Sequence, residues 1–227
     1  MKRLLCKIVM TMSVVGMFGQ GVDADRCLLS VIGDSYVANH RASSSETWHA
    51  KWAAAHGYDY QNVGRNGGCV AFDRTREGFG PSMMVRYRQI SPEADIVLII
   101  AGHNDADKCG TNEDSVRMFA DSLSQLIIRI KEQCPKARLG YVTPWALNRQ
   151  DFKMIRKAIL HVCRKAHVPV LDNFRKSCPI RVNDNEFRKK YFQSPKDRAH
   201  LNTWGHDLFL PYASKWMEAL AEGKGSR

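Results

Sequence analysis

The sequence has no hydrophobic run long enough to span a lipid bilayer. The apolar stretch at residues 8–18 covers only eleven residues, whereas a transmembrane helix needs about 20. The basic residues Lys2, Arg3 and Lys7 stand at or before its start, and small or compact residues precede Ala24. A basic start, a short apolar core and a compact end are typical of a secretory signal peptide.

The chain is therefore expected to divide into a signal peptide over residues 1–24, cleaved near Ala24, and one domain over residues 25–227. Removal of the signal peptide would leave no membrane-spanning segment and place the protein in the periplasm or outside the cell. The domain also lacks internal repeats, low-complexity segments and linkers. It is long enough to fold around one sizeable core.

Signatures of bound cofactors are missing as well. The histidine, cysteine and acidic residues do not cluster with the spacing of a metal site, and neither a phosphate-binding loop nor a dinucleotide-binding fingerprint occurs. We therefore expect chemistry that uses no metal and no cofactor. Nucleic acid is not an expected partner, because the chain is expected to be exported and has no nucleic-acid-binding module.

Acidic residues are fewer than basic ones, 23 against 34, which gives a formal net charge of +11. The excess is densest in residues 174–198, where eight lysines and arginines stand against three acidic residues. A solvated surface without a specific partner explains such a run. The alternative is a surface that attracts an anionic polymer to the site.

Strand-like and helix-like segments alternate through the domain. Compact apolar runs predict strands, and apolar residues at helical spacing predict helices. This alternation implies right-handed crossovers, a parallel sheet and helices on both faces of the sheet. The predicted strands cover residues 27–32, 58–63, 96–101, 137–142 and 168–171, and the predicted helices cover residues 45–56, 111–133, 151–166 and 203–221.

Four short blocks lie at corresponding points of this pattern. Three stand at or just after the ends of the first three predicted strands, and the fourth precedes the last predicted helix. Sites form at the carboxyl ends of the strands in such sheets, so we expect the four blocks to meet at one edge. They read Gly-Asp-Ser at residues 33–35, Asn-Val-Gly-Arg-Asn-Gly at 62–67, Gly-His-Asn-Asp at 102–105 and Asp-Arg-Ala-His at 197–200.

Ser35, His200 and Asp197 are candidate catalytic residues. A serine hydroxyl is a weak nucleophile until a neighbouring base takes its proton. Three residues apart, Asp197 can accept the Nδ1–H of His200 and leave Nε2 to face Ser35, which would fix the tautomer of the base. Each block alone has a plainer interpretation, because Gly-Asp-Ser is common in turns and Asp-x-x-His is common where a helix begins.

Three groups are candidate donors to an oxyanion: the backbone N–H of Ser35, the backbone N–H of Gly67 and the side-chain amide of Asn104. Hydrogen-bond donors aimed at a developing alkoxide are each worth about 10²- to 10³-fold in rate. Gly64 and Gly68 are rivals of Gly67. Asn104 could instead cap a loop, a common role of asparagine.

Together and in this order, the four blocks resemble the SGNH (GDSL-type) serine hydrolase family over nearly the whole domain. Asn202 and Gly205 continue the last block as they typically do in that family, and the family spacing favours Gly67 as the oxyanion donor. Tyr36 stands where the family often has leucine, and His103 where it often has a small residue or threonine. The resemblance implies a three-layer α/β/α, flavodoxin-like fold with about five parallel strands.

The cysteine count permits disulfides in an exported protein. Of the seven cysteines, Cys6 would leave with the signal peptide, and the remaining six allow up to three bridges. A bridge between Cys69 and Cys109 would tie together two loops of the expected site. The alternative is that several cysteines are buried free thiols.

The family resemblance implies a serine esterase that works by two-step acyl transfer. A compact chain without a long apolar lid favours small acyl groups, above all acetyl, removed from a carbohydrate. One alternative is a lysophospholipase or thioesterase that acts on longer acyl chains. Another is a catalytically silent glycan-binding protein on the same fold, because fold alone does not establish activity.

Other aromatic residues are weaker candidates for the site. Trp145 and Trp204 lie on or beside the expected edge loops and could stack on a sugar ring. His103 could contact substrate, although a structural role in its loop is the favoured interpretation. Trp48 and Trp52 are four residues apart, so we expect both to face the core from one helix.

Overall fold

The computed structural model describes residues 26–224, so the predicted signal peptide lies outside the described residues. Within them, five parallel strands form one sheet in the order β2-β1-β3-β4-β5. This confirms the predicted three-layer α/β/α fold with its parallel sheet. The strands are β1 (Leu28–Gly33), β2 (Asp59–Gly64), β3 (Ile96–Ile100), β4 (Arg138–Val142) and β5 (Val170–Leu171).

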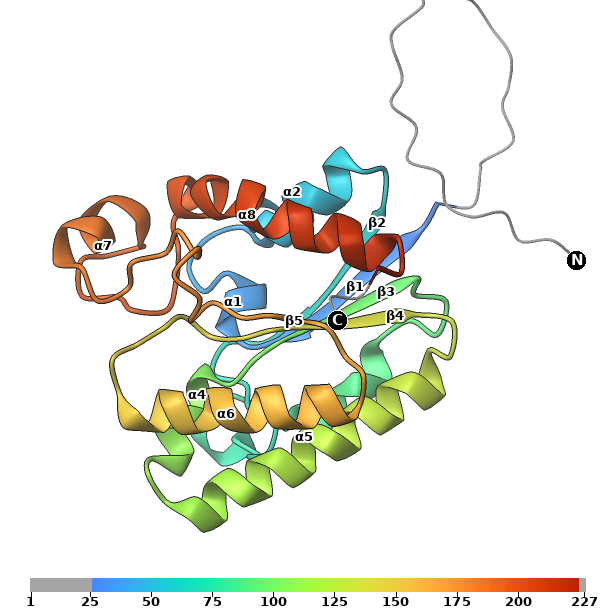
Figure 1. Cartoon of the computed structure of the whole chain (residues 1–227), viewed down its shortest axis with the longest axis horizontal. Coiled ribbons are helices and arrows are strands. Elements are labelled where there is room, and N and C mark those ends of the chain that lie inside the picture. Colours follow the sequence, from blue (N-terminus) through green and yellow to red (C-terminus); the bar gives the residue numbers. More distant parts are fainter. Residues whose placement is uncertain (1–25, 225–227) are drawn as a thin grey trace, which may run out of the picture.

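Helices cover both faces of the sheet (Figure 1). Helices α2 (Trp48–Ala55) and α8 (Thr203–Ala221) pack together on one face. Helices α4 (His103–Cys109), α5 (Glu113–Gln133) and α6 (Gln150–Lys165) cover the other face. The shorter helices are α1 (Ser35–Ala38), α3 (Met83–Arg86) and α7 (Asn185–Tyr191), with single 3₁₀ turns at Ser44–Glu46, Thr75–Glu77 and Tyr87–Gln89.

The strand at the centre of the sheet, β3, is apolar along its whole length. All five of its residues are buried, because it pairs with β1 on one side and β4 on the other and helices cover both faces. A strand in this position has no polar face, and an unbroken aliphatic run suits it. Trp48 and Trp52 are also buried, which confirms their expected place in the core.

Four short helices, α1, α3, α4 and α7, were not expected from the sequence. Both α4 and α7 are seven residues long and mostly polar, so neither shows an apolar period. The predicted start of α5, at residue 111, is two residues early, because that helix begins at Glu113. Asn112 caps that helix, and its side chain accepts a hydrogen bond from the Ser115 N–H at 2.8 Å.

The expected disulfide between Cys69 and Cys109 is wrong. Both are buried free thiols, as are Cys134 and Cys163. Another interaction ties the two loops together: the carboxylate of Asp105, at the start of α4, accepts hydrogen bonds from backbone N–H groups next to Cys69. Among residues 26–224, no helix is long and apolar enough to cross a membrane.

Gly33 lies where β1 turns into α1. A Cβ atom at this position would lie 2.4 Å from the backbone oxygen of Ile100 and 2.3 Å from a methyl carbon of Val37. Both the neighbouring strand and the following helix therefore close onto the glycine. This close approach places Ser35 at the carboxyl end of β1.

We expect Gly33→Ala to lower the free energy of unfolding by about 2–3 kcal/mol, because the added methyl group overlaps backbone atoms. Gly57→Ala is the control. Gly57 has a φ of +71° and no atom within 4 Å of an added Cβ, so it should lose only about 1 kcal/mol to left-handed strain. Equilibrium urea unfolding measures both, and equal losses would contradict the role given to Gly33.

Candidate active site

Ser35 is the first residue of α1, directly after the end of β1. Asp34 caps this short helix, because its carboxylate accepts a hydrogen bond from the Tyr36 N–H at 2.9 Å. The turn brings the Ser35 side chain to the edge of the sheet, where it lines an open hollow of about 430 Å³. Sequence order and strand position thus place this hydroxyl where a substrate can reach it.

A chain of hydrogen bonds connects Ser35 to the loop that precedes α8. The Ser35 Oγ lies 2.8 Å from Nε2 of His200, and Nδ1 of His200 lies 2.9 Å from Oδ2 of Asp197. The structure therefore brings the three candidate catalytic residues together. In this arrangement an imidazole can take a proton from a serine while a carboxylate holds its tautomer.

The Asp197 carboxylate is held in its charged form. Burial alone would raise its pKa, but hydrogen bonds from the His200 side chain and from the N–H groups of His200 and Ala199 outweigh burial and lower the pKa. The carboxylate is therefore ionised at neutral pH. It can stabilise a positive charge on the imidazole.

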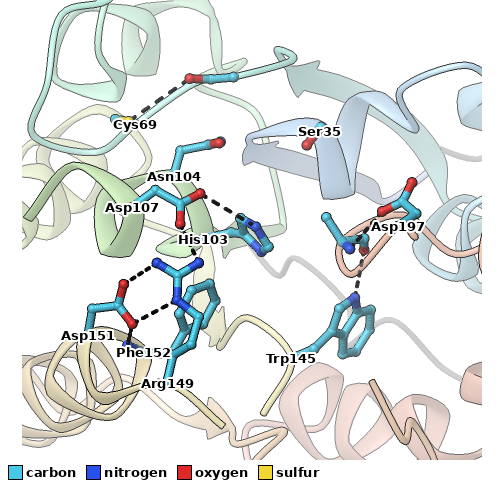
Figure 2. A network of polar contacts seen from close by, with 12 residues as sticks. Ser35, Cys69, His103, Asn104, Asp107, Trp145, Arg149, Asp151, Phe152 and Asp197 are labelled. Carbon is cyan, nitrogen blue, oxygen red and sulfur yellow. Dashed lines mark hydrogen bonds and ion pairs between the residues drawn. The ribbon is translucent and has the colours of Figure 1, made fainter. Parts of the chain in front are cut away.

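Trp145 supports the His200 loop from below. Its indole N–H donates a hydrogen bond to the carbonyl oxygen of Ala199 at 2.7 Å (Figure 2). The ring packs edge-on against Tyr36 and Phe209. Only 3% of the residue is exposed, so the suggestion that Trp145 could stack on a sugar is wrong. Its role is to hold the backbone between Asp197 and His200.

Residues 174–198 do not form one uniform basic surface. Arg188 is buried, and its guanidinium donates hydrogen bonds to the carbonyl oxygens of Val182 and Pro195 at 2.8 and 2.9 Å. It therefore braces the chain that leads to Asp197. A neighbouring lysine on α7, Lys189, is paired with Glu186.

Gly67 is the glycine of its block that keeps a free N–H. The N–H of Gly64 donates to Oδ1 of Asn62 at 2.8 Å, and the N–H of Gly68 donates to the carbonyl oxygen of Arg65 at 3.0 Å. Within residues 26–224, the Gly67 N–H has no acceptor. This difference favours Gly67 over its two rivals as an oxyanion donor.

The backbone at Gly67 needs a glycine. Its φ is +69°, and a Cβ atom there would lie 2.1 Å from the ring of Phe79. The guanidinium of Arg74 donates a hydrogen bond to the Gly67 carbonyl oxygen at 2.8 Å and lies over the Phe79 ring. This hydrogen bond holds the Gly67 carbonyl in place and helps to fix the backbone on which the Gly67 N–H lies.

Asn104 comes from the first turn of α4, after β3. Its side-chain amide donates one hydrogen bond to the carbonyl oxygen of Gly68 at 3.0 Å, and an amide nitrogen carries a second hydrogen. Asn104 shares the 430 Å³ hollow with Ser35, Gly67 and His200. The three candidate oxyanion donors therefore lie around one space next to the Ser35 hydroxyl.

A serine, a histidine–aspartate pair and a set of donors thus meet at the edge of an α/β/α sheet. Residues 31–208, more than half of the chain, match the GDSL-like lipase/acylhydrolase family. The chain belongs to this family. It is therefore a GDSL-type hydrolase, as the four sequence blocks implied.

Solved structures share the fold of this hydrolase at low sequence identity. One is a protein from Lactobacillus plantarum, with 18% identity and a TM-score of 0.69 over 86% of this chain and 98% of that one. Another is the acetyl xylan esterase AlAXEase, with 16% identity and a TM-score of 0.58 over 84% and 98%.

A third is an active-site mutant of a family two carbohydrate esterase from Clostridium thermocellum, with 13% identity and a TM-score of 0.62 over 86% of this chain and 63% of that one. These likenesses concern the fold. The sequences of curated proteins give no match to this chain.

Two buried carboxylates lie beneath the site of the hydrolase. Burial raises the pKa of Asp105 to about 6, although its oxygens accept hydrogen bonds from the N–H groups of Val70 and Ala71. Burial raises the pKa of Asp34 to about 8. Among the described residues, Oδ2 of Asp34 has no hydrogen-bond partner. The guanidinium of Arg86 is also buried and favours the charged form of Asp34.

Asp34 should make the protein less stable as the pH rises. Its pKa is about 8 in the folded protein and about 3.9 in an unfolded chain. The folded state therefore holds the proton more tightly, and the stabilisation present below about pH 4 is lost between pH 4 and 8.

Asp34→Asn keeps an oxygen for the Tyr36 N–H and removes the charge. We expect its free energy of unfolding to match that of the wild type below about pH 4 and to exceed it by at least about 1 kcal/mol at pH 8. Asp121→Asn, on the exposed face of α5, controls for the loss of a negative charge. A difference that does not grow with pH would contradict the assignment.

The other two suggested substrate contacts, His103 and Trp204, lie in different surroundings. His103 is largely buried, its Nδ1 lies 3.0 Å from the Tyr36 hydroxyl, and its ring meets Phe152 edge-on. Burial lowers its pKa to about 4, so the ring is neutral and serves the packing beneath the site (Figure 2). Trp204 is 65% exposed at the start of α8, where an aromatic surface is open to solvent.

His40 lies in the site although the sequence gave no sign of it. Its ring stacks on the ring of His200, with centroids 4.3 Å apart and planes 18° apart. His40 and the preceding Asn39 both have a positive φ, which turns the chain back after α1. Asn39 is a recognisable left-handed helix cap, but the stacking itself depends on the tertiary structure.

Proposed function

We propose that the protein is a serine esterase that removes short acyl groups, above all acetyl, from a carbohydrate. One observation carries the proposal. The hydrogen-bonded chain Asp197–His200–Ser35 ends in an open hollow whose lining residues mostly carry polar or charged side chains. The hydrogen bonds allow Ser35 to act as a nucleophile, and the lining residues support a short acyl group on a carbohydrate.

The first half of the reaction forms an acyl-enzyme. The Ser35 Oγ attacks the ester carbonyl carbon while Nε2 of His200 takes its proton, and Asp197 stabilises the resulting imidazolium. The negative charge on the carbonyl oxygen is held by the N–H groups of Ser35 and Gly67 and by the Asn104 amide. The imidazolium then gives its proton to the departing alcohol oxygen.

The second half of the reaction regenerates the enzyme. His200 takes a proton from water, and the water oxygen attacks the acyl carbon on Ser35. The same donors hold the second oxyanion. When it collapses, the carboxylic acid leaves and the proton returns from His200 to the Ser35 Oγ.

The lining of the hollow favours a short acyl group. Phe79 is the single large apolar side chain there. A long alkyl chain would cover charged and polar groups without replacing their hydrogen bonds to water, which is costly. Acetyl covers little of this surface, whereas sugar hydroxyls can bond to it. The polar lining residues apart from Ser35 and His200 are His40, Asn66, Arg74, Asn104, Asp107 and Lys108.

Two further arguments support a carbohydrate substrate. Proteins of the same fold include an acetyl xylan esterase and a family two carbohydrate esterase. The sequence before residue 25 has the pattern of a secretory signal peptide. We therefore include action outside the cytoplasm, on glycans met there, in the proposal.

Hydrolysis of p-nitrophenyl esters from acetate to long chains tests this proposal. We expect kcat/KM to be highest for acetate and to fall with chain length, and we expect Ser35→Ala to lose activity by about 10⁴-fold or more. Ser124→Ala, on α5 at the far side of the sheet, is the matched serine control and should keep full activity. Release of acetate from acetylated xylan then tests the alcohol part of the substrate.

Other results of the ester series would favour one of the two alternative functions. A preference for long chains would contradict the short-acyl assignment and indicate lipid or thioester substrates. Ester hydrolysis that persists in Ser35→Ala would contradict the catalytic assignment. If no ester is hydrolysed but the folded protein binds xylan, the family fold would serve a glycan-binding role.

A further inference from the structure

A second hollow lies against the outer side of the catalytic loop. It has a volume of about 300 Å³ and does not include Ser35. The stacked rings of His40 and His200 line both this hollow and the 430 Å³ hollow over Ser35. The two rings therefore form a shared wall. The second hollow is lined by His40, Arg41, Gln193, Ser194, Lys196, Asp197 and His200.

Two cations converge on this second hollow from distant parts of the chain. Arg41 follows α1, and Lys196 lies in the loop after α7. Both are exposed, and neither forms an ion pair with any residue between 26 and 224. Asp197 is the acidic residue in the lining, and its oxygens are occupied by hydrogen bonds from the His200 ring and two backbone N–H groups.

The two cations that line the hollow over Ser35 are already paired. Arg74 and Lys108 both contact Glu77, Arg74 at 2.7 Å and Lys108 at 2.6 Å. Arg149 lies 2.8 Å from Asp107, and Figure 2 shows this ion pair below Asn104. Of the cations that line the two hollows, the two without a carboxylate partner, Arg41 and Lys196, both line the second one. An anion placed there would gain attraction without displacing an existing ion pair.

We propose that the second hollow binds an anionic group, a carboxylate or a phosphate, on the alcohol part of the ester. The inference rests on the proposed esterase function. His200 must give its proton to the departing alcohol oxygen, so the alcohol part lies next to the His200 ring. A substituent that extends past the wall formed by His40 and His200 reaches Arg41 and Lys196.

The sequence left open an anionic partner for the basic residues 174–198, and this inference assigns that role to a smaller set of residues. Arg188 is buried and braces the chain, and Lys189 is paired with Glu186. Of the basic residues in that segment, Lys196 alone lines the second hollow, and it acts together with Arg41 from outside the segment. The substrate class is therefore an ester of an acidic alcohol, such as an acylated acidic sugar.

Paired substrates test the inference. The probes are 4-acetoxybenzoate, which carries a carboxylate, its neutral methyl ester, and 4-acetoxyphenyl phosphate. For each protein the measured quantity is the kcat/KM of the anionic ester divided by that of the neutral ester. We expect this ratio to fall about fivefold in Arg41→Gln and in Lys196→Gln and further in the double variant, with the neutral ester unaffected.

Lys176→Gln is the matched control, because it removes one exposed positive charge of the same segment outside both hollows. Its ratio should stay at the wild-type value. Added salt should lower the wild-type ratio, since exposed charges are screened. The carboxylate and phosphate probes are compared in the same variants, and the probe with the larger charge-dependent ratio identifies the anion.

Direct binding separates this inference from the esterase proposal. In Ser35→Ala, which cannot turn over the probe, an NMR titration measures the affinity of 4-acetoxybenzoate with and without Arg41→Gln and Lys196→Gln. Weaker binding in the double variant, with no hydrolysis by the wild type, would support the anion site and contradict the esterase. Hydrolysis with an unchanged ratio and unchanged binding in the double variant would overturn the anion site.

Discussion

The hydrogen bond between the Ser35 Oγ and Nε2 of His200 joins two parts of the chain that lie 165 residues apart. The rest of the structure serves this contact from both sides. Gly33 allows β1 and β3 to close onto the start of α1, which fixes the serine. Trp145 and Arg188 hold the backbone on either side of Asp197, which fixes the histidine. A 2.8 Å contact of this kind requires that both supports are rigid.

The site also carries the cost of two buried carboxyl groups. Asp34 forms the cap that turns the chain toward Ser35, yet it lies fully inside the protein with one oxygen unpartnered among the described residues. Asp105 is buried too, and it links the start of α4 to the loop after Gly67. Each carboxylate positions a donor or the nucleophile at the expense of its own hydration. The two buried carboxyl groups thus lower the stability of the fold while they fix the positions of the residues at the catalytic edge.

The interior of the sheet could be predicted from the sequence because its buried strands are largely apolar runs, as in β1 and β3. The residues at the strand ends could be predicted because the order of strands determines which loops meet. The roles of the residues that support the site could not be predicted. Trp145 looked like a candidate platform for sugars, Cys69 looked like a candidate for a bridge, and Arg188 looked like a surface charge. Their roles depend on burial and on partners far away in the sequence. The stacking of His40 on His200 likewise depends on the tertiary structure, because Asn39 indicates the left-handed turn but not the ring that His40 meets.

The central claim is that Ser35 is a nucleophile activated by His200. Reaction with a fluorophosphonate probe tests it most directly, because the probe forms a stable bond with an activated serine. Intact-mass analysis followed by peptide sequencing should find one adduct per chain, on Ser35, and His200→Ala should greatly slow its formation. An adduct on another serine, or ester hydrolysis that continues in protein fully labelled elsewhere, would contradict the account.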